Sequence, residues 1–297
     1  MKHSGCGIVA AVVHGGANLR SRKLLLCMLA VTLTASPVRA EGPGLQTMEM
    51  GTGPTVVMVP GIGGTRTDWL QTVKRLRDRY HCVMVEIPGQ GTSPLPEPFS
   101  LQAAAQALDA VIAKQKPEST IVVANGVGGT LALLAASAHP EHLRGLMLID
   151  TPVKSPLPIP DQQRAQIIKF MEESYDQFSR MLFSSMGRDS AESTQLYALM
   201  AAVPPATVKA YFREMFAADA NRELKELKVP VALAFTERSW KAGTSAGTVM
   251  RTFGMEDSTL AVPMRIANAG RLPMKDQPDT LATWISGFAA RSFAAKK

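Results

Sequence analysis

The feature that most constrains this chain is a regular alternation between short apolar runs and longer segments with helical periodicity. Buried strands of a parallel sheet read as continuous apolar runs, because helices cover both faces of the sheet. Six such runs are TVVMVP at 55–60, CVMVEIP at 82–88, TIVVAN at 120–125, LRGLMLID at 143–150, VPVALAF at 229–235 and PMRIAN at 263–268. Helical patterns occupy 66–79, 101–115, 127–138 and 279–293. This order predicts an α/β fold with a mostly parallel, doubly wound sheet.

The alternation stops between Thr151 and Lys228, where the sequence has helical periodicity and no strand pattern. An all-helical insertion between two core strands is typical of a lid across one end of the sheet. Its methionine and phenylalanine side chains either line an adaptable apolar pocket or pack the lid onto the core. We therefore predict four parts, which are a leader at 1–40, a first core part at 41–153, the lid at 154–228 and a second core part at 229–297.

The first 40 residues have the pattern of a secretory signal peptide. They contain five basic residues and no acidic residue, and an apolar run from Leu24 to about Ala35 precedes small residues and a cleavage point after Ala40. Because the run is short for a bilayer span, we predict a secreted or periplasmic protein with no stable membrane span after cleavage. An uncleaved amphipathic anchor is the alternative.

Charge outside this leader gives no support for a nucleic-acid partner. The chain has 32 basic and 25 acidic residues, and removing the five basic residues of the leader leaves 27 against 25, or about +2. That balance is too small for a nucleic-acid or polybasic membrane surface. We predict no cofactor and no metal site, because no cysteine and histidine cluster has metal-ligand spacing and the glycine-rich stretches lack the Walker lysine.

Several segments carry a family pattern in the right order along the chain. They are VVMVPGIGGTRTDW at 56–69, VEIPGQGTSP at 85–94, IVVANGVGGTLALLAAS at 121–137, AHPEHLRGLMLID at 138–150 and NAGRLPMKDQPD at 268–279. Together they resemble the α/β-hydrolase fold superfamily, in its lidded esterase, haloperoxidase and C–C hydrolase branch, over about residues 46–293. The resemblance implies an oxyanion hole made by the backbone N–H groups of Ile62 and Val127.

The three positions that the resemblance assigns to a catalytic triad hold other residues. The family's G-x-S-x-G pentapeptide aligns with 124–128, which places Gly126 at the nucleophile position. The acid position holds Ser239 and the histidine position holds Arg271, while Glu237 lies two residues before the acid position. The histidines beyond the leader are expected at the opposite end of the sheet; they are His81, His139 and His142. These residues give no support for serine-type hydrolysis.

These substitutions lead to one main prediction and two alternatives. The main prediction is an exported, catalytically degenerate hydrolase that binds an unknown protein partner or a small apolar molecule bearing a carbonyl or carboxylate group. Its predicted binding residues are Gly61, Ile62, Gly126, Val127 and Arg271. The first alternative is an active ester or C–C bond hydrolase with a non-standard site, which takes a base from another chain or uses a bound water. The second is a structural or interaction protein with a filled pocket.

Two of the predicted site residues have a simpler interpretation. Arg271 is equally compatible with a solvated arginine that pairs with Glu237 or Asp276, and an exposed pair of this kind contributes little to stability. Gly126 adopts without cost the strained backbone conformation that the family imposes on its nucleophile, a conformation that costs a residue with a Cβ about 1–3 kcal/mol.

Overall fold

The computed structural model describes residues 44–155, 160–184, 187, 189–256 and 261–294. The leader predicted at 1–40 lies outside these residues, so its cleavage and the export of the protein stay predictions. Within the described ranges, no helix is both long enough and apolar enough to cross a bilayer.

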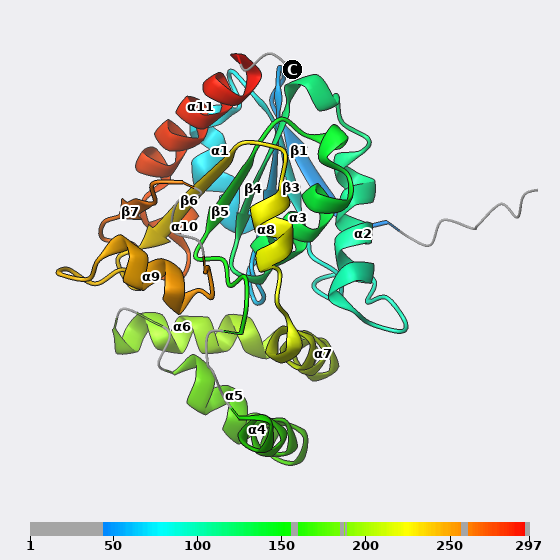
Figure 1. The fold of residues 1–297 in the computed structure, drawn as a ribbon, viewed down its shortest axis with the longest axis vertical. Helices are drawn as coiled ribbons and strands as arrows, with labels where there is room; N and C mark the ends of the chain where they lie inside the picture. The colour runs from blue at the N-terminus through cyan, green and yellow to red at the C-terminus, as the bar shows by residue number, and fades with distance from the viewer. Residues whose placement is uncertain (1–43, 156–159, 185–186, 188, 257–260, 295–297) are drawn as a thin grey trace, which may run out of the picture. The chain divides into compact units, whose positions relative to one another are not determined.

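Within the described residues, seven strands form one sheet in the order β1-β3-β2-β4-β5-β6-β7 (Figure 1). Every neighbouring pair is parallel except β1 and β3, which are antiparallel. The strands are β1 Thr47–Met50, β2 Thr55–Val59, β3 His81–Val85, β4 Thr120–Asn125, β5 Leu146–Ile149, β6 Val231–Thr236 and β7 Met264–Ile266. The prediction of a mostly parallel, doubly wound sheet is confirmed, and each of the six apolar runs overlaps one of the strands β2 to β7.

Helices cover both faces of the sheet because alternate strand residues point to opposite sides. On one face, Val57 and Val59 of β2 pack in a core with α2 (Leu101–Ile112), α3 (Val127–Ala138) and α8 (Asn221–Glu226). On the other face, Val56 and Met58 pack in a second core with α1 (Leu70–Leu76) and α11 (Pro278–Ala294). The remaining short elements are η1 Arg66–Trp69, η2 Pro117–Ser119, η3 Pro140–His142, α9 Ala246–Thr252 and α10 Pro273–Asp276.

Between β5 and β6, the described residues form four lid helices followed by α8. The lid helices are α4 Asp161–Glu173, α5 Tyr175–Phe183, α6 Ser190–Ala201 and α7 Pro205–Ala217. Figure 1 shows them grouped beyond one end of the sheet, whereas α8 returns to pack against α3. The helical insertion is therefore present, and its last helix belongs to the covering layer of the sheet.

The turn from β4 into α3 has a conformation that favours glycine. Gly126 lies at φ 56° and ψ −132°, a region that residues with a Cβ rarely adopt. A Cβ built on Gly126 would meet only the Cα of Gly61, at 3.6 Å, which is ordinary van der Waals contact. The backbone conformation, rather than lack of space, is therefore what favours glycine here.

We predict that Gly126→Ala lowers the free energy of unfolding by about 1–3 kcal/mol, because the positive φ is strained for alanine. Gly287→Ala is the matched control, since Gly287 lies in the interior of α11, where alanine is favoured by about 0.5–1 kcal/mol. Urea unfolding followed by circular dichroism measures both changes. Equal stabilities of the Gly126→Ala variant and the unmodified protein would show that the turn carries no strain.

Candidate active site

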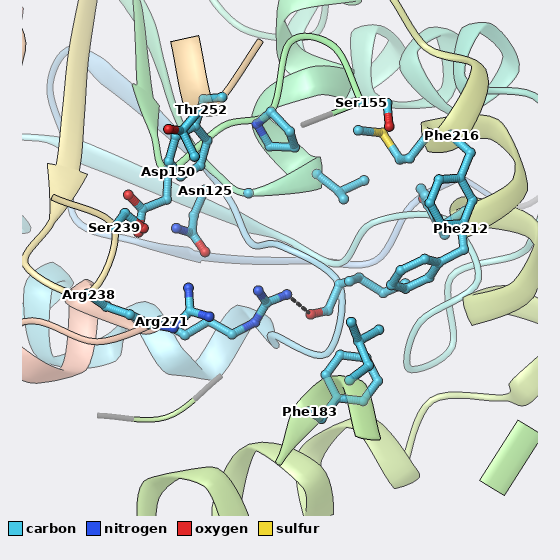
Figure 2. Close-up of a pocket in the computed structure, with 18 of the residues that line it drawn as sticks. Asn125, Asp150, Ser155, Phe183, Phe212, Phe216, Arg238, Ser239, Thr252 and Arg271 are labelled. Carbon is cyan, nitrogen blue, oxygen red and sulfur yellow. Dashed lines mark hydrogen bonds between the residues drawn. The ribbon is translucent and has the colours of Figure 1, made fainter. Parts of the chain in front are cut away.

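A cavity of about 530 Å³ lies between the lid and the ends of β4, β5 and β6. Figure 2 shows polar residues gathered on one side of it, with phenylalanines of the lid on the other. The lining residues include the polar Asn125, Asp150, Arg238, Ser239 and Arg271 and, from the lid, Phe178, Phe183, Phe212, Phe216 and Met215. The cavity is open, so the lid side chains line it rather than fill it, which disfavours the alternative of a protein with a filled pocket.

The positions singled out in the sequence meet at this cavity. Ile62, Gly126, Val127, Ser239 and Arg271 all line it. Gly61 lies directly beside Gly126, as the short distance from its Cα shows. Residues remote in sequence are thus brought to one end of the sheet.

The three histidines lie elsewhere, each within reach of a carboxylate. The Nε2 of His81 is 3.0 Å from Glu49, and the Nδ1 of His142 is 2.8 Å from Asp109. His139 stacks on His142 with ring centroids 5.0 Å apart. None of the three lines the cavity described above.

Asp150 lines the cavity, although the sequence analysis did not predict it as a site residue. The register of β4 and β5 pairs Asn125 with Ile149, and the N–H of Gly126 donates to the carbonyl of Ile149 at 2.9 Å. The next residue after Ile149 is Asp150, so it follows β5 beside the point where Gly126 follows β4. A polar residue immediately after a buried parallel strand is the signal that could have identified it.

The carboxylate of Asp150 is held by β6 and partly withdrawn from water. The backbone N–H of Thr236 donates to its Oδ1 at 3.0 Å, and the hydroxyl of Thr236 donates to its Oδ2 at 2.5 Å. Burial raises the pKa of Asp150, and the hydrogen bonds from Thr236 and Ser239 only partly offset this effect. Asp150 also has a positive φ of 43°, which aspartate tolerates better than most residues.

Two arginines give this end of the cavity its positive charge. Arg271 donates from Nη2 to the carbonyl of Ile62 at 3.2 Å (Figure 2). Desolvation lowers the pKa of Arg271 to about 10, with repulsion from Arg238 adding to this and attraction to Asp150 opposing it, so Arg271 is a cation at neutral pH. Glu237, one of the partners considered for Arg271, pairs with Arg265 at 3.1 Å instead.

The loop that carries Ile62 is held in place by the buried side chain of Gln90. Its Oε1 accepts from the N–H of Gly63 at 2.5 Å, and its Nε2 donates to the carbonyls of Gly61 and Gly64 at 3.5 and 3.4 Å. Because C=O and N–H point in opposite directions across a trans peptide, the N–H of Ile62 points away from Gln90. At Val127, the first backbone N–H of α3 has no partner within its own helix. These two N–H groups are the predicted oxyanion hole.

Residues 56–284 match the sequence profile of the alpha/beta hydrolase family, which is more than half of the 297 residues. The chain belongs to the alpha/beta hydrolase family. Among solved structures, a hydrolase from Oleispira antarctica superposes with a TM-score of 0.67 at 15% identity, covering 82% of this chain and 94% of that one. A thermophilic esterase from Thermogutta terrifontis superposes with a TM-score of 0.66 at 19% identity, covering 84% and 94%. These likenesses support the fold.

Curated relatives within this family are named as esterases. A pimeloyl-(acyl-carrier protein) methyl ester esterase of Pseudoalteromonas atlantica is 26% identical over 160 residues, which are 50% of this chain and 60% of that protein. An esterase of the same name from Aeromonas hydrophila is 33% identical over 101 residues, covering 33% and 38%. The chain thus spans less than two thirds of the length of these relatives.

These relatives contradict the main prediction of a catalytically degenerate hydrolase and favour the alternative of an active one. The prediction rested on the three triad positions, Glu237 and the histidines, and it left out Asp150, a carboxylate in the same cavity whose pKa is raised by burial.

We predict that Gln90→Leu lowers the free energy of unfolding by about 1–3 kcal/mol, because the buried N–H of Gly63 loses its acceptor. Gln102→Leu on the exposed side of α2 is the matched control and is expected to change the same quantity by less than about 0.5 kcal/mol. Thermal or urea unfolding measures both variants. If they unfold alike, Gln90 does not hold the loop of Ile62.

Proposed function

We propose that this chain is a carboxylic-ester hydrolase in which a water molecule, activated by Asp150, replaces the serine nucleophile of its family. The observation that carries this proposal is a carboxylate with a raised pKa that lines the same open, mostly apolar cavity as Val127. A general base works best when its pKa lies close to the operating pH. The esterase names of the curated relatives support the same reaction class.

In the proposed reaction, the ionised carboxylate of Asp150 removes a proton from water as the water oxygen attacks the ester carbonyl carbon. The negative charge that develops on the carbonyl oxygen is accepted by the N–H groups of Ile62 and Val127. The C–O bond to the alcohol then breaks, and the leaving alkoxide takes the proton back from Asp150. The products are one carboxylic acid and one alcohol, and the Asp150 carboxylate is regenerated.

The arginines favour the charged transition state over the neutral ester. The guanidinium groups of Arg238 and Arg271 lie on the same side of the cavity as Asp150 (Figure 2). Positive charge in a site partly shielded from water attracts the developing oxyanion more strongly than it would in bulk water. Arg271 also holds the carbonyl of Ile62, so it helps fix the loop that carries one oxyanion donor.

The opposite side of the cavity sets the substrate class. Phe178, Phe183 and Phe212 come from the lid, together with the flexible thioether of Met215. A cavity of about 530 Å³ lies within the range that holds small organic ligands. We therefore propose esters with a short or medium apolar acyl chain as substrates.

We predict that Asp150→Asn lowers kcat for p-nitrophenyl butyrate and hexanoate by about 100-fold or more, the typical contribution of a general base. An asparagine amide can still accept from the N–H of Thr236, so the fold is retained. Glu237→Gln is the matched control and leaves kcat unchanged, because Glu237 pairs with Arg265 and does not line the cavity. Rates of p-nitrophenol release measure both.

The time course separates this chemistry from a covalent mechanism. Direct attack by water forms no acyl-enzyme, so p-nitrophenol release is expected to be linear from the first turnover. A burst of one equivalent per chain, or equal rates for the unmodified protein and Asp150→Asn, contradicts the proposed role of Asp150.

We also predict a pH dependence that follows from the direction of the Asp150 shift. Only the ionised carboxylate is a base, and burial raises its pKa above the ordinary aspartate value of 3.8. As pH falls through this raised pKa, kcat/KM is expected to fall with it. A profile that stays flat down to the ordinary aspartate range would show that another group is the base.

A further inference from the structure

At the opposite end of α3 from the cavity, two histidines and a buried aspartate converge. His139 ends α3, His142 closes the short helix η3, and Asp109 lies in the last turn of α2. Each offers one ligand atom, and these atoms all lie within 4.8 Å of one another. We propose that Asp109, His139 and His142 form a binding site for a divalent transition metal, and for Zn²⁺ in particular.

The local backbone explains why the two imidazoles face the same way. The N–H of His142 donates to the carbonyl of His139 at 3.1 Å, so the chain turns tightly between the two histidines. The two rings are accordingly stacked, with an interplanar angle of 14°. One nitrogen of each ring faces Asp109, which is Nε2 in His139 and Nδ1 in His142.

The distances suit a tetrahedral ion after small side-chain rotations. Zinc binds histidine nitrogen and carboxylate oxygen at about 2.0–2.2 Å, so neighbouring ligand atoms of a tetrahedron are about 3.3 Å apart. The Nδ1 of His142 is 2.8 Å from Oδ1 of Asp109, and the Nε2 of His139 is 3.9 Å from Oδ2 of the same residue. These two separations bracket the required value, and the two histidine nitrogens lie within 4.8 Å of each other, so rotation of the half-exposed His139 ring would bring the three atoms together. Three protein ligands leave the fourth position to water.

Glu141 supplies the outer partner that metal-binding histidines usually have. The ring nitrogens of His139 and His142 that face away from Asp109 lie 3.1 and 3.8 Å from Oε1 of Glu141. A carboxylate in this position orients the imidazole and makes its other nitrogen a better ligand. The two carboxylates also balance the charge of a divalent cation.

The site joins segments that are distant in sequence. Asp109 is only 8% exposed and belongs to α2, whereas both histidines belong to the connection between α3 and β5. A metal bound to all three would therefore tie α2 to the end of α3 and stabilise the folded state. A search for short metal-binding motifs in the sequence does not find this site, because Asp109 lies 30 residues before His139.

We predict that tag-free protein dialysed against EDTA binds one equivalent of Zn²⁺ per chain and melts at a higher temperature with ZnCl₂ than without it. Removing a ligand in His139→Ala or His142→Ala is expected to weaken binding by at least about 100-fold, and Glu141→Gln by about 10–100-fold. His81→Ala removes a histidine that contacts Glu49 at the same end of the sheet, where the parallel strands begin; it is the matched control and leaves binding unchanged. Competition with a chromophoric chelator measures the affinities.

Cobalt provides a second measurement of the same site. Co²⁺ in a tetrahedral site gives intense visible bands, which are expected with the unmodified protein and lost in His139→Ala. His139 is half exposed, so its replacement tests the site without disturbing the core. The proposal is overturned if the unmodified protein binds no Zn²⁺, or if both histidine variants bind it as tightly as the unmodified protein does. These outcomes do not depend on ester hydrolysis.

Discussion

The register between β4 and β5 sets the geometry on which the cavity depends. Because Asn125 pairs with Ile149, the residues that follow the two strands leave the sheet side by side. Gly126 donates to the carbonyl of Ile149, and Asp150 donates to the carbonyl of Ala234 in the next strand. A slip of one residue would turn every side chain of a strand to the other face. The hydrophobic cores on both faces of the sheet therefore also fix the positions of the residues that follow the carboxyl ends of β4 and β5.

The ionisation of Asp150 depends on two opposing effects, which are the loss of water around its carboxylate and the hydrogen bonds and positive charge that replace this water. Burial opposes ionisation of Asp150, and two hydrogen bonds from Thr236 with the charge of Arg238 partly offset it. A raised pKa makes the ionised carboxylate a stronger base than an ordinary aspartate, which is the property that the proposed reaction needs. Two arginines against one carboxylate leave an excess of positive charge for an oxyanion.

Most of the fold and part of the candidate site can be predicted from the sequence. Apolar runs with helices between them predict strands β2 to β7, whereas β1 lacks such a run because it is a short edge strand with an exposed Glu49. Gly126, Ser239 and Arg271 could be placed at the cavity because each occupies a recognisable position of the family pattern. The role of Asp150 could not be predicted in the same way. Its raised pKa comes from burial by distant segments, which residue type alone does not reveal.

Helix α3 joins the two proposed sites through its ends. Its N-terminus presents the N–H of Val127 to the cavity, where the helix dipole favours negative charge, and its C-terminus at His139 favours a cation. An oxyanion at one end and a metal at the other therefore both agree with the direction of the dipole. With 12 residues, α3 is about 18 Å long, and the dipole effect fades beyond the terminal turns. A metal at His139 would thus act through the stability of α3 rather than through the charge in the cavity.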